Sequence, residues 1–251
     1  MSKPSNTKVT VSIDQQGIAE VVLNRPEKLN ALDMEMFKAI NKTISELKNN
    51  KQIRVVILYG AGDDFCSGLD IKAVMKSPSS AIRLLAKWLP GNANLAQKVT
   101  ANWRKLPVPV IAAIHGRCWG GGMQIALGAD FRIAAPDSSL SIMEAKWGLI
   151  PDMAGNSALA KLMPIDQAMK LTMTAQTFNG NQGQDYQLIT EVNDQPLTRA
   201  RALASELLNT SPDVIAATKK LFYKNWHRSQ RNMLGDESWY QIKILAGKNQ
   251  R

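Results

Sequence analysis

The chain has 251 residues, of which 45% are hydrophobic and 21% charged, and its formal net charge at pH 7 is +10. This length fits one large domain or a domain with an appendage. The composition excludes a disordered chain and a membrane-spanning one. The polar start "MSKPSNTK" lacks the apolar segment of a signal peptide, so we expect a cytoplasmic protein. The positive charge suits an anionic small molecule, whereas scattered Lys and Arg without a recognition motif argue against nucleic acid.

The first part of the sequence predicts a hairpin, a helix and a buried strand. Alternating apolar residues over 8–14 and 18–23 indicate two strands around the turn "QQG". Asp33 then stands where a helix cap is expected, before an amphipathic helix over 34–50. The apolar stretch 53–60 predicts a buried strand, and the loop "GDDFCSGLDI" follows it.

The second part predicts further strands alternating with helices. Broken helix over 71–104 precedes the buried strand "PVPVIAAIHG" and a helix from Met123 to about Gly128. Strand material follows in "ADFRIAAPDSSLSI", and a helix is expected from about Asn156. The remaining sequence is mostly helical, including the periodic stretch "SPDVIAATKKLFYKNW". This alternation predicts an α/β protein.

Three consecutive glycines, Gly120 to Gly122, lie where a strand is followed by a helix. The first amides of a helix are free to bind an anion at the positive end of the helix dipole. A nucleotide-binding P-loop is excluded because Met123 and Gln124 follow the glycines in place of Lys and Ser or Thr, and no GxGxxG pattern occurs. The glycines therefore predict either an oxyanion hole or tight packing of the helix on the sheet.

A second glycine loop, "FCSGLD" at residues 65–70, also follows a strand and precedes a helix. Two loops at the ends of neighbouring strands can direct two backbone donors at one oxygen, as an oxyanion hole requires. Alone, this loop is equally well explained as an ordinary turn.

Two carboxylates, Glu144 and Asp152, lie on the stretch "MEAKWGLIPDMAG". Apolar neighbours of Glu144 are expected to raise its pKa toward that of a base at neutral pH. Two carboxylates on one loop can act at opposite ends of a small substrate. The alternative is structural: Glu144 pairs with Lys146 or Arg132, and Asp152 caps the helix that follows.

Other kinds of site find little support in the sequence. Neither histidine has a GxSxG partner, which argues against a serine hydrolase. No HxH, HExxH or paired CxxC occurs, and Cys66 and Cys118 have no zinc spacing, so we expect no metal.

Taken together, the motifs resemble the crotonase superfamily, the enoyl-CoA hydratases and isomerases. The stretches that carry the resemblance are "LNRPEKLNALD", "FCSGLDI", "HGRCWGGGMQIALGADFRIAAPDSSLSIMEAKWGLIPDMAG" and "SPDVIAATKKLF". The resemblance implies an α/β, ClpP-like spiral of β-β-α units over residues 1–195, with the acyl-CoA site. It also implies a helical segment over 196–251 for oligomerisation, and a homotrimer or homohexamer. The implied ligand is an acyl-CoA thioester, with no separate cofactor because coenzyme A is part of the substrate.

The resemblance also assigns roles to individual residues. The oxyanion donors fall on the backbone amides of Leu69 and Gly121. The contacts to the CoA substrate fall on Lys28, Ala31, Ser67, Gly68, Asp70, Ile71 and Gln124, and more loosely on Lys220 and Phe222, which are expected to reach the CoA of a neighbouring subunit.

The reaction type depends on three positions. Two-glutamate hydratases of the family resemble this chain at Glu144, but their other glutamate corresponds to Gln124, which can orient water without accepting its proton. Dienoyl-CoA isomerases carry an aspartate eight residues after the glutamate, as Asp152 follows Glu144 here, although they have aspartate at the place of Gln124. The resemblance thus favours double-bond isomerisation. Hydration is the alternative within the family, and a non-catalytic acyl-CoA or RNA-binding member is a third.

Overall fold

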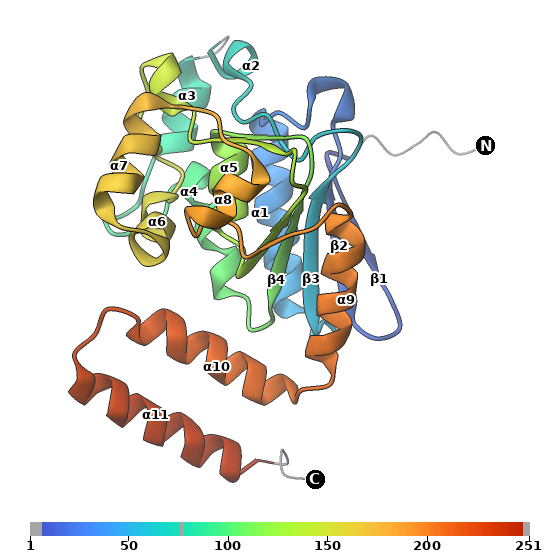
Figure 1. The fold of residues 1–251 in the computed structure, drawn as a ribbon, viewed down its shortest axis with the longest axis vertical. Coiled ribbons are helices and arrows are strands. Elements are labelled where there is room, and N and C mark those ends of the chain that lie inside the picture. The colour runs from blue at the N-terminus through green and yellow to red at the C-terminus, as the bar shows by residue number, and fades with distance from the viewer. Residues whose placement is uncertain (1–6, 76–77, 248–251) are drawn as a thin grey trace.

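The computed structural model describes residues 7–75 and 78–247, and its centre is a six-stranded sheet in the order β1-β2-β3-β4-β6-β8 (Figure 1). A small second sheet pairs β5 with β7. The strands are β1 (Val9–Ile13), β2 (Ile18–Leu23), β3 (Val55–Gly60), β4 (Val110–Ile114), β5 (Arg117–Trp119), β6 (Phe131–Ala134), β7 (Ser139–Ser141) and β8 (Glu191–Val192). Among these strands β1 and β2 pair antiparallel and the other pairs are parallel.

Helices occupy most of the remaining chain. They are α1 (Met34–Asn49), α2 (Ile71–Met75), α3 (Pro78–Leu85), α4 (Leu95–Ala101), α5 (Gly121–Leu127), α6 (Asn156–Leu162), α7 (Ile165–Thr174), α8 (Gly180–Asp185), α9 (Pro196–Leu208), α10 (Pro212–Asn225) and α11 (Gln230–Leu245). The described residues also form the 3₁₀ helices η1 (Pro26–Lys28), η2 (Trp103–Lys105) and η3 (Glu144–Trp147).

Helix α1 forms where the sequence predicts it and for the predicted reasons. The Asp33 carboxylate accepts a hydrogen bond from the N–H of Met36 at 2.8 Å, which satisfies one free donor of the first turn. The apolar residues at helical spacing face the core, and the buried ones include Phe37, Ile40 and Ile44. This face fixes α1 against the main core of the protein.

Helix α5 begins earlier than the sequence prediction, which started the helix at Met123. Its first residues are Gly121 and Gly122. A side chain at Gly122 would place its Cβ only 2.3 Å from the carbonyl oxygen of Cys66, so the helix start packs directly on the neighbouring glycine loop. Glycine, a poor helix former, is accepted in this first turn because no larger residue fits.

The sheet separates two apolar clusters. The larger one contains α1, α4 and α5, and the smaller one is formed where α9 packs on the other face with Ala200 and Ala204. Strand β4 leads into β5 and α5, and β6 leads into β7 and η3, so the chain turns twice from the large sheet to the small one. The predicted order of β-β-α units is therefore present. The loops that follow β5 and β7 lie at one end of the molecule.

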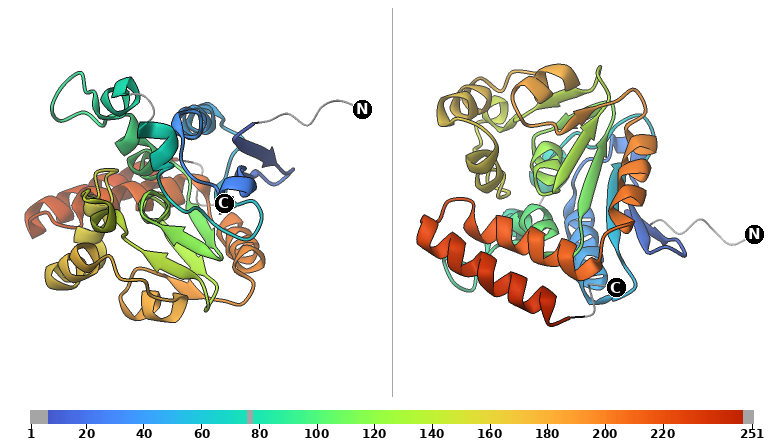
Figure 2. Two further views of the ribbon diagram at one scale, coloured as in Figure 1. Left: turned by 90° about the horizontal axis from the view of Figure 1, so that it is seen from above. Right: turned by 60° about the horizontal axis from the view of Figure 1, so that its bottom comes forward.

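The last two helices, α10 and α11, form a hairpin that lies beside the rest of the molecule (Figures 1 and 2). Helix α9, which the sequence division at residue 195 grouped with them, instead packs on the sheet. The division into residues 1–195 and 196–251 itself stays a prediction.

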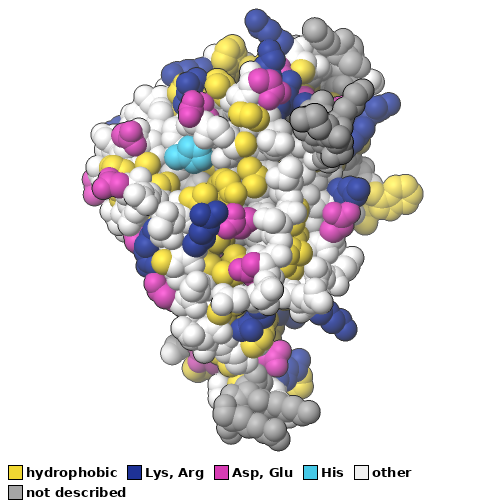
Figure 3. Space-filling model, turned by 90° about the vertical axis from the view of Figure 1, so that its right-hand side faces the viewer, with side chains coloured by type: hydrophobic (Ala, Val, Ile, Leu, Met, Phe, Trp, Pro, Cys, Tyr) yellow, Lys and Arg dark blue, Asp and Glu magenta, His cyan; other side chains and the backbone are white. Residues whose placement is uncertain are grey.

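Two surface properties bear on the expected partners. Among the described residues, none of the helices combines the length and apolar character that crossing a bilayer requires. On the face shown in Figure 3, Lys and Arg side chains are interspersed with acidic and hydrophobic ones and form no continuous basic surface.

Candidate active site

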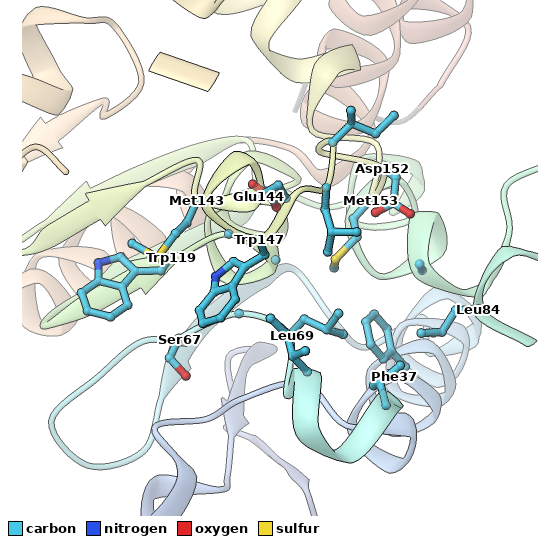
Figure 4. A pocket seen from close by; sticks show the side chains of 18 of the residues that line it. Phe37, Ser67, Leu69, Leu84, Trp119, Met143, Glu144, Trp147, Asp152 and Met153 are labelled. Carbon is cyan, nitrogen blue, oxygen red and sulfur yellow. The ribbon is translucent and has the colours of Figure 1, made fainter. Parts of the chain in front are cut away.

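Both glycine loops and the loop after β7 line a single pocket of about 400 Å³ (Figure 4). The walls are mostly apolar, and the residues that line it are Phe37, Ser67, Gly68, Leu69, Ile71, Val74, Leu84, Leu85, Ala96, Trp119, Gly120, Gly121, Met143, Glu144, Trp147, Leu149, Ile150, Asp152 and Met153. Within this set the ionisable side chains are Glu144 and Asp152, and no basic side chain is present. An apolar cleft with a few polar groups is the usual form of a site for a small molecule.

The two glycine loops touch one another at Gly68 and the start of α5. Gly68 has a positive φ of +91°, and a Cβ there would lie 2.7 Å from the carbonyl oxygen of Trp119 and 3.2 Å from the amide nitrogen of Gly121. Only glycine allows both this backbone conformation and this approach. The sequence alone left the loops as possible separate turns, and the structure brings them together.

This contact places two unused backbone donors at the pocket. Neither the N–H of Leu69 nor the N–H of Gly121 donates to an acceptor among the described residues, whereas their neighbours Gly120 and Asp70 donate to Ser141 and Leu32. Gly121 is the first residue of α5, so its N–H has no partner within the helix. The arrangement can bind an oxygen that gains negative charge.

Glu144 is buried at the start of η3, with 8% of its surface exposed. Its Oε1 accepts a hydrogen bond from Nε2 of Gln124 at 2.5 Å, and its Oε2 has no partner among the described residues. Burial raises the pKa of Glu144, the nearby charge of Asp152 adds to the rise, and the hydrogen bond from Gln124 opposes it. A carboxylate with a raised pKa and one free oxygen can accept a proton from a ligand in the pocket.

Asp152 lies at the pocket rim as an exposed residue, eight positions beyond Glu144. Partial burial raises its pKa above the ordinary aspartate value. No side-chain hydrogen bond or ion pair occupies its carboxylate within the described residues. Figure 4 shows Glu144 and Asp152 reaching the pocket from separate places on the same loop, with Met153 beside Asp152.

The structural alternative for these two carboxylates does not hold. Arg132 instead donates to the carbonyl oxygens of Leu188 and Ala129, and the described residues include no ion pair of Glu144 with it or with Lys146. Helix α6 has Gly155 at its N-cap, without a side-chain cap from Asp152.

Gln124 is placed differently from the other residues predicted to contact CoA. Its side chain is 1% exposed and lies beneath the pocket, outside the residues that line it. Its amide is enclosed by Glu144 and by the backbone of Met153 and Gly155, and the expected substrate contact at Gln124 stays a prediction. Sequence position could not show this, because both backbone partners come from a distant loop.

With the geometry established, comparison with known proteins decides the family. Residues 14–246 match the family described as enoyl-CoA hydratase/isomerase. The chain belongs to this family. The predicted crotonase membership and the α/β crotonase fold are thereby confirmed.

Relatives of known name agree with this placement. The chain is 32% identical over 236 residues to carnitinyl-CoA dehydratase of Escherichia coli (strain SMS-3-5 / SECEC), covering 92% of this chain and 85% of the relative. It is 31% identical to enoyl-CoA hydratase domain-containing protein 2, mitochondrial, of Bos taurus, covering 81% and 69%. The crystal structure of enoyl-CoA hydratase from Thermoplasma volcanium GSS1 matches with a TM-score of 0.86 and 25% identity, covering 97% of this chain and 94% of the other.

A second hollow of this hydratase/isomerase family member adjoins the main pocket and is lined by four of the predicted CoA contacts, Lys28, Ala31, Asp70 and Ile71. It shares Leu69, Ile71 and Trp147 with the pocket, and its other lining residues are Arg25, Lys28, Ala31, Asp70, Lys72 and Ala73. Basic side chains gather here, whereas the main pocket has none, so the two hollows differ in charge. Ser67 and Gly68 line the main pocket.

Asp70 is engaged within the protein. Its Oδ2 accepts a hydrogen bond from Nη1 of Arg25 at 2.9 Å, and its Oδ1 accepts one from the N–H of Ala73. Burial alone would raise the pKa of Asp70, but these two hydrogen bonds and the positive charges of Arg25 and Lys28 lower it. Arg25 was not among the predicted site residues, although it stands within the quoted motif "LNRPEKLNALD".

Lys220 and Phe222 lie on α10, outside both hollows. The ammonium group of Lys220 is 6.0 Å from the ring centre of Tyr240, and Phe222 stacks on Trp226. Their expected contact with the CoA of a neighbouring subunit stays a prediction.

Several apolar side chains of the pocket were not selected from the sequence. Trp147 and Met153 belong to the stretch "MEAKWGLIPDMAG", so proximity to the carboxylates was an available signal. Phe37 and Leu84 come from α1 and α3, and only the fold brings them to the pocket. The described residues contain no group of three His, Cys, Asp or Glu side chains that could hold a metal ion.

Proposed function

We propose that this protein moves a carbon–carbon double bond within an acyl-CoA thioester through an enolate. The observation that carries the proposal is the pairing of Glu144 and Asp152, both with raised pKa, in one apolar pocket that also has two unused backbone donors. The pairing supports a transfer in which a proton leaves one carbon and a proton arrives at another.

In this mechanism the amides of Leu69 and Gly121 bind the thioester oxygen. Each donor is expected to stabilise the developing enolate by roughly 3 kcal/mol. The carboxylate of Glu144 takes a proton from the carbon next to the thioester, and the electron pair moves onto the oxygen. As the electrons return, the solvent-exposed Asp152 passes a proton taken from water to the far carbon of the unsaturated system, and Glu144 then releases its proton to solvent.

The acyl part of the substrate is expected to be neutral or apolar. The walls near the carboxylates include Phe37, Val74, Leu84 and Ala96. Since the lining holds two acidic side chains and no basic one, a free carboxylate on the acyl chain would have no positive partner and would be repelled.

The proposal is tested by offering the protein a 3,5-dienoyl-CoA, a 3-enoyl-CoA and a 2-enoyl-CoA. Formation of a conjugated product from either of the first two is followed by absorbance and mass spectrometry. Glu144→Gln is expected to lower kcat by at least about 10²-fold, as for loss of a general base, and Asp152→Asn to lower it with the dienoyl substrate. Turnover that survives both substitutions would contradict the proposal.

Hydration or dehydration is the second candidate, and it is favoured by the relative named carnitinyl-CoA dehydratase. In that case water is added across the carbon–carbon double bond next to the thioester, or is lost to form that double bond, with Glu144 as the base. The result that selects it is a mass change of one water that persists in Asp152→Asn and disappears in Glu144→Gln. The enclosed amide oxygen of Gln124 speaks against Gln124 as the group that orients this water.

A non-catalytic acyl-CoA or RNA-binding role is the third possibility considered from the sequence. Absence of turnover with all three thioesters, together with tight and salt-sensitive RNA binding, would replace both enzymatic proposals.

A further inference from the structure

The amide of Gln124 joins the two carboxylate-bearing segments of the site. Its Oε1 accepts hydrogen bonds from the N–H groups of Met153 at 2.9 Å and Gly155 at 3.1 Å, and its Nε2 donates to Oε1 of Glu144 at 2.5 Å. Met153 directly follows Asp152, so one buried side chain contacts both Glu144 and the segment that presents Asp152.

The two backbone donors determine which way the amide is oriented. An N–H can donate only to the oxygen end of the amide, so with two of them at Oε1 the nitrogen end must face Glu144. The nitrogen end has only hydrogens to offer, and Glu144 can meet it only with an acceptor oxygen. The orientation therefore follows from the chemistry of all three partners.

The backbone around Asp152 is shaped to receive this oxygen. Ala154 has a positive φ of +69°, which is rare for a residue with a side chain, and it lies between the two N–H donors. A Cβ at Gly155 would come within 2.9 Å of both Cγ and Oε1 of Gln124. Ala154 turns the donors toward one point and Gly155 leaves the space for the amide.

We propose that Gln124 is a positioning residue that holds Oε1 of Glu144 in place and ties Glu144 to the segment of Asp152. The proposal rests on the proposed function only in naming Glu144 as the base. Gln124 itself acts through Glu144, because it lies beneath the pocket lining.

A neutral amide suits this position better than a carboxylate of the same length. Glutamate could also accept from Met153 and Gly155, but its second oxygen would face Oε1 of Glu144 with like charge. One proton would then be shared between the two carboxylates, and Glu144 would no longer titrate independently. Asp152 is the other described group whose charge acts on Glu144.

The test compares Gln124→Glu and Gln124→Met with the matched substitutions Gln184→Glu and Gln184→Met. Gln184 is exposed on α8, outside both hollows. The titration of Glu144 is followed by NMR of ¹³C-labelled glutamate, with its signal assigned by loss in Glu144→Gln. The kinetic readouts are kcat, KM and the pH profile with the accepted thioester.

We expect Gln124→Met to lower kcat on the order of 10²-fold with little change in KM, since misplacement of a reacting group by about 1 Å has that effect. Gln124→Glu keeps an acceptor for both backbone donors, so the loop is retained. We expect it to move the titration of Glu144, and the acid limb of the pH profile, to higher pH. The Gln184 variants are expected to match the wild type.

A merely structural role would appear as a folded Gln124→Met with unchanged kcat and an unchanged titration of Glu144, and this result would overturn the proposal. If Gln124→Met fails to fold, Gln124→Glu carries the test alone. If the wild type turns over none of the thioesters, the proposed function fails, while the NMR titration still decides whether Gln124 controls Glu144.

Discussion

Glu144 occupies a position that disfavours its charged form. Burial raises its pKa, and the hydrogen bonds from its own backbone N–H and from Gln124 compensate only in part. A solvent-exposed carboxylate would be a weaker base, because its conjugate acid loses the proton far below neutral pH. The same burial that makes Glu144 useful for proton transfer thus reduces the stability of the fold.

The raised pKa of Glu144 predicts opposite effects of pH on activity and on stability. Activity needs the ionised base, so kcat/KM should fall as pH decreases through a value above the ordinary pKa of glutamate. For a carboxyl group with a raised folded-state pKa, the stabilising contribution is present below about pH 4.3 and is lost as pH rises through the folded pKa.

Glu144→Gln removes this titration, so we expect it to unfold at higher urea concentration than the wild type at pH 7 to 8. The difference should disappear below about pH 4. Urea unfolding at a series of pH values measures it, with the exposed Glu46→Gln as the control. Equal stability of Glu144→Gln and wild type at pH 8 would show that burial of the charge costs nothing.

The sequence predicted the two carboxylates of the site but not the hydrogen bonds that connect their segments. The apolar neighbours of Glu144 correctly indicated a raised pKa, because residues adjacent in sequence contribute to its burial. The contacts of Gln124 with Met153 and Gly155 span 29 and 31 positions, and no local pattern encodes them.

Among the elements, α10 is held by one buried polar cluster. Nζ of Lys219 donates to Oδ2 of Asp130 at 2.7 Å and to the carbonyl oxygen of Val108 at 2.8 Å, and the hydroxyl of Tyr223 donates to Oδ1 of Asp130 at 2.8 Å. Asp130 also accepts from the N–H of Val110 at the start of β4. The helix hairpin is thereby connected to the central sheet.

Lys219→Met is expected to destabilise the protein by about 3 kcal/mol, because it leaves the largely buried carboxylate of Asp130 without its counter-charge, although Tyr223 and Val110 still donate to it. The free energy of unfolding is measured by urea denaturation. The exposed Lys38→Met on α1 is the matched control and should change stability by less than about 0.5 kcal/mol. A loss no larger than that of the control would mean that the cluster does not hold α10.

Sequence patterns located the hairpin of β1 and β2, helix α1 and helix α10, since each depends on local periodicity and capping. They could not assign strand partners between distant segments. The pairing of β5 with β7 and the bridge between Leu32 and Leu69 shape the pocket. Both depend on how the whole chain folds.

The last helix, α11, leaves several large apolar side chains uncovered by the rest of the chain. No residue of α11 is buried, and the exposed apolar side chains of this helix are Leu234, Trp239, Ile242 and Leu245. Large exposed apolar side chains grouped on one helix are typical of an interface between subunits. It agrees with the expectation, from the family resemblance, of a homotrimer or homohexamer.

The exposed apolar side chains of α11 predict that the chain assembles into a trimer or hexamer. Light scattering coupled to size exclusion should give the wild type a mass of three or six times the 27.6 kDa of one chain. Leu234→Lys combined with Ile242→Lys places two charges on the exposed apolar face of α11 and is expected to shift the protein toward the mass of one chain, because a charge without a partner is costly to bury between subunits. Gln184→Lys adds the same residue at an exposed position of α8, away from α11, and should leave the mass unchanged. A wild type that is monomeric, or a double variant that keeps the full mass, would show that α11 does not join the subunits.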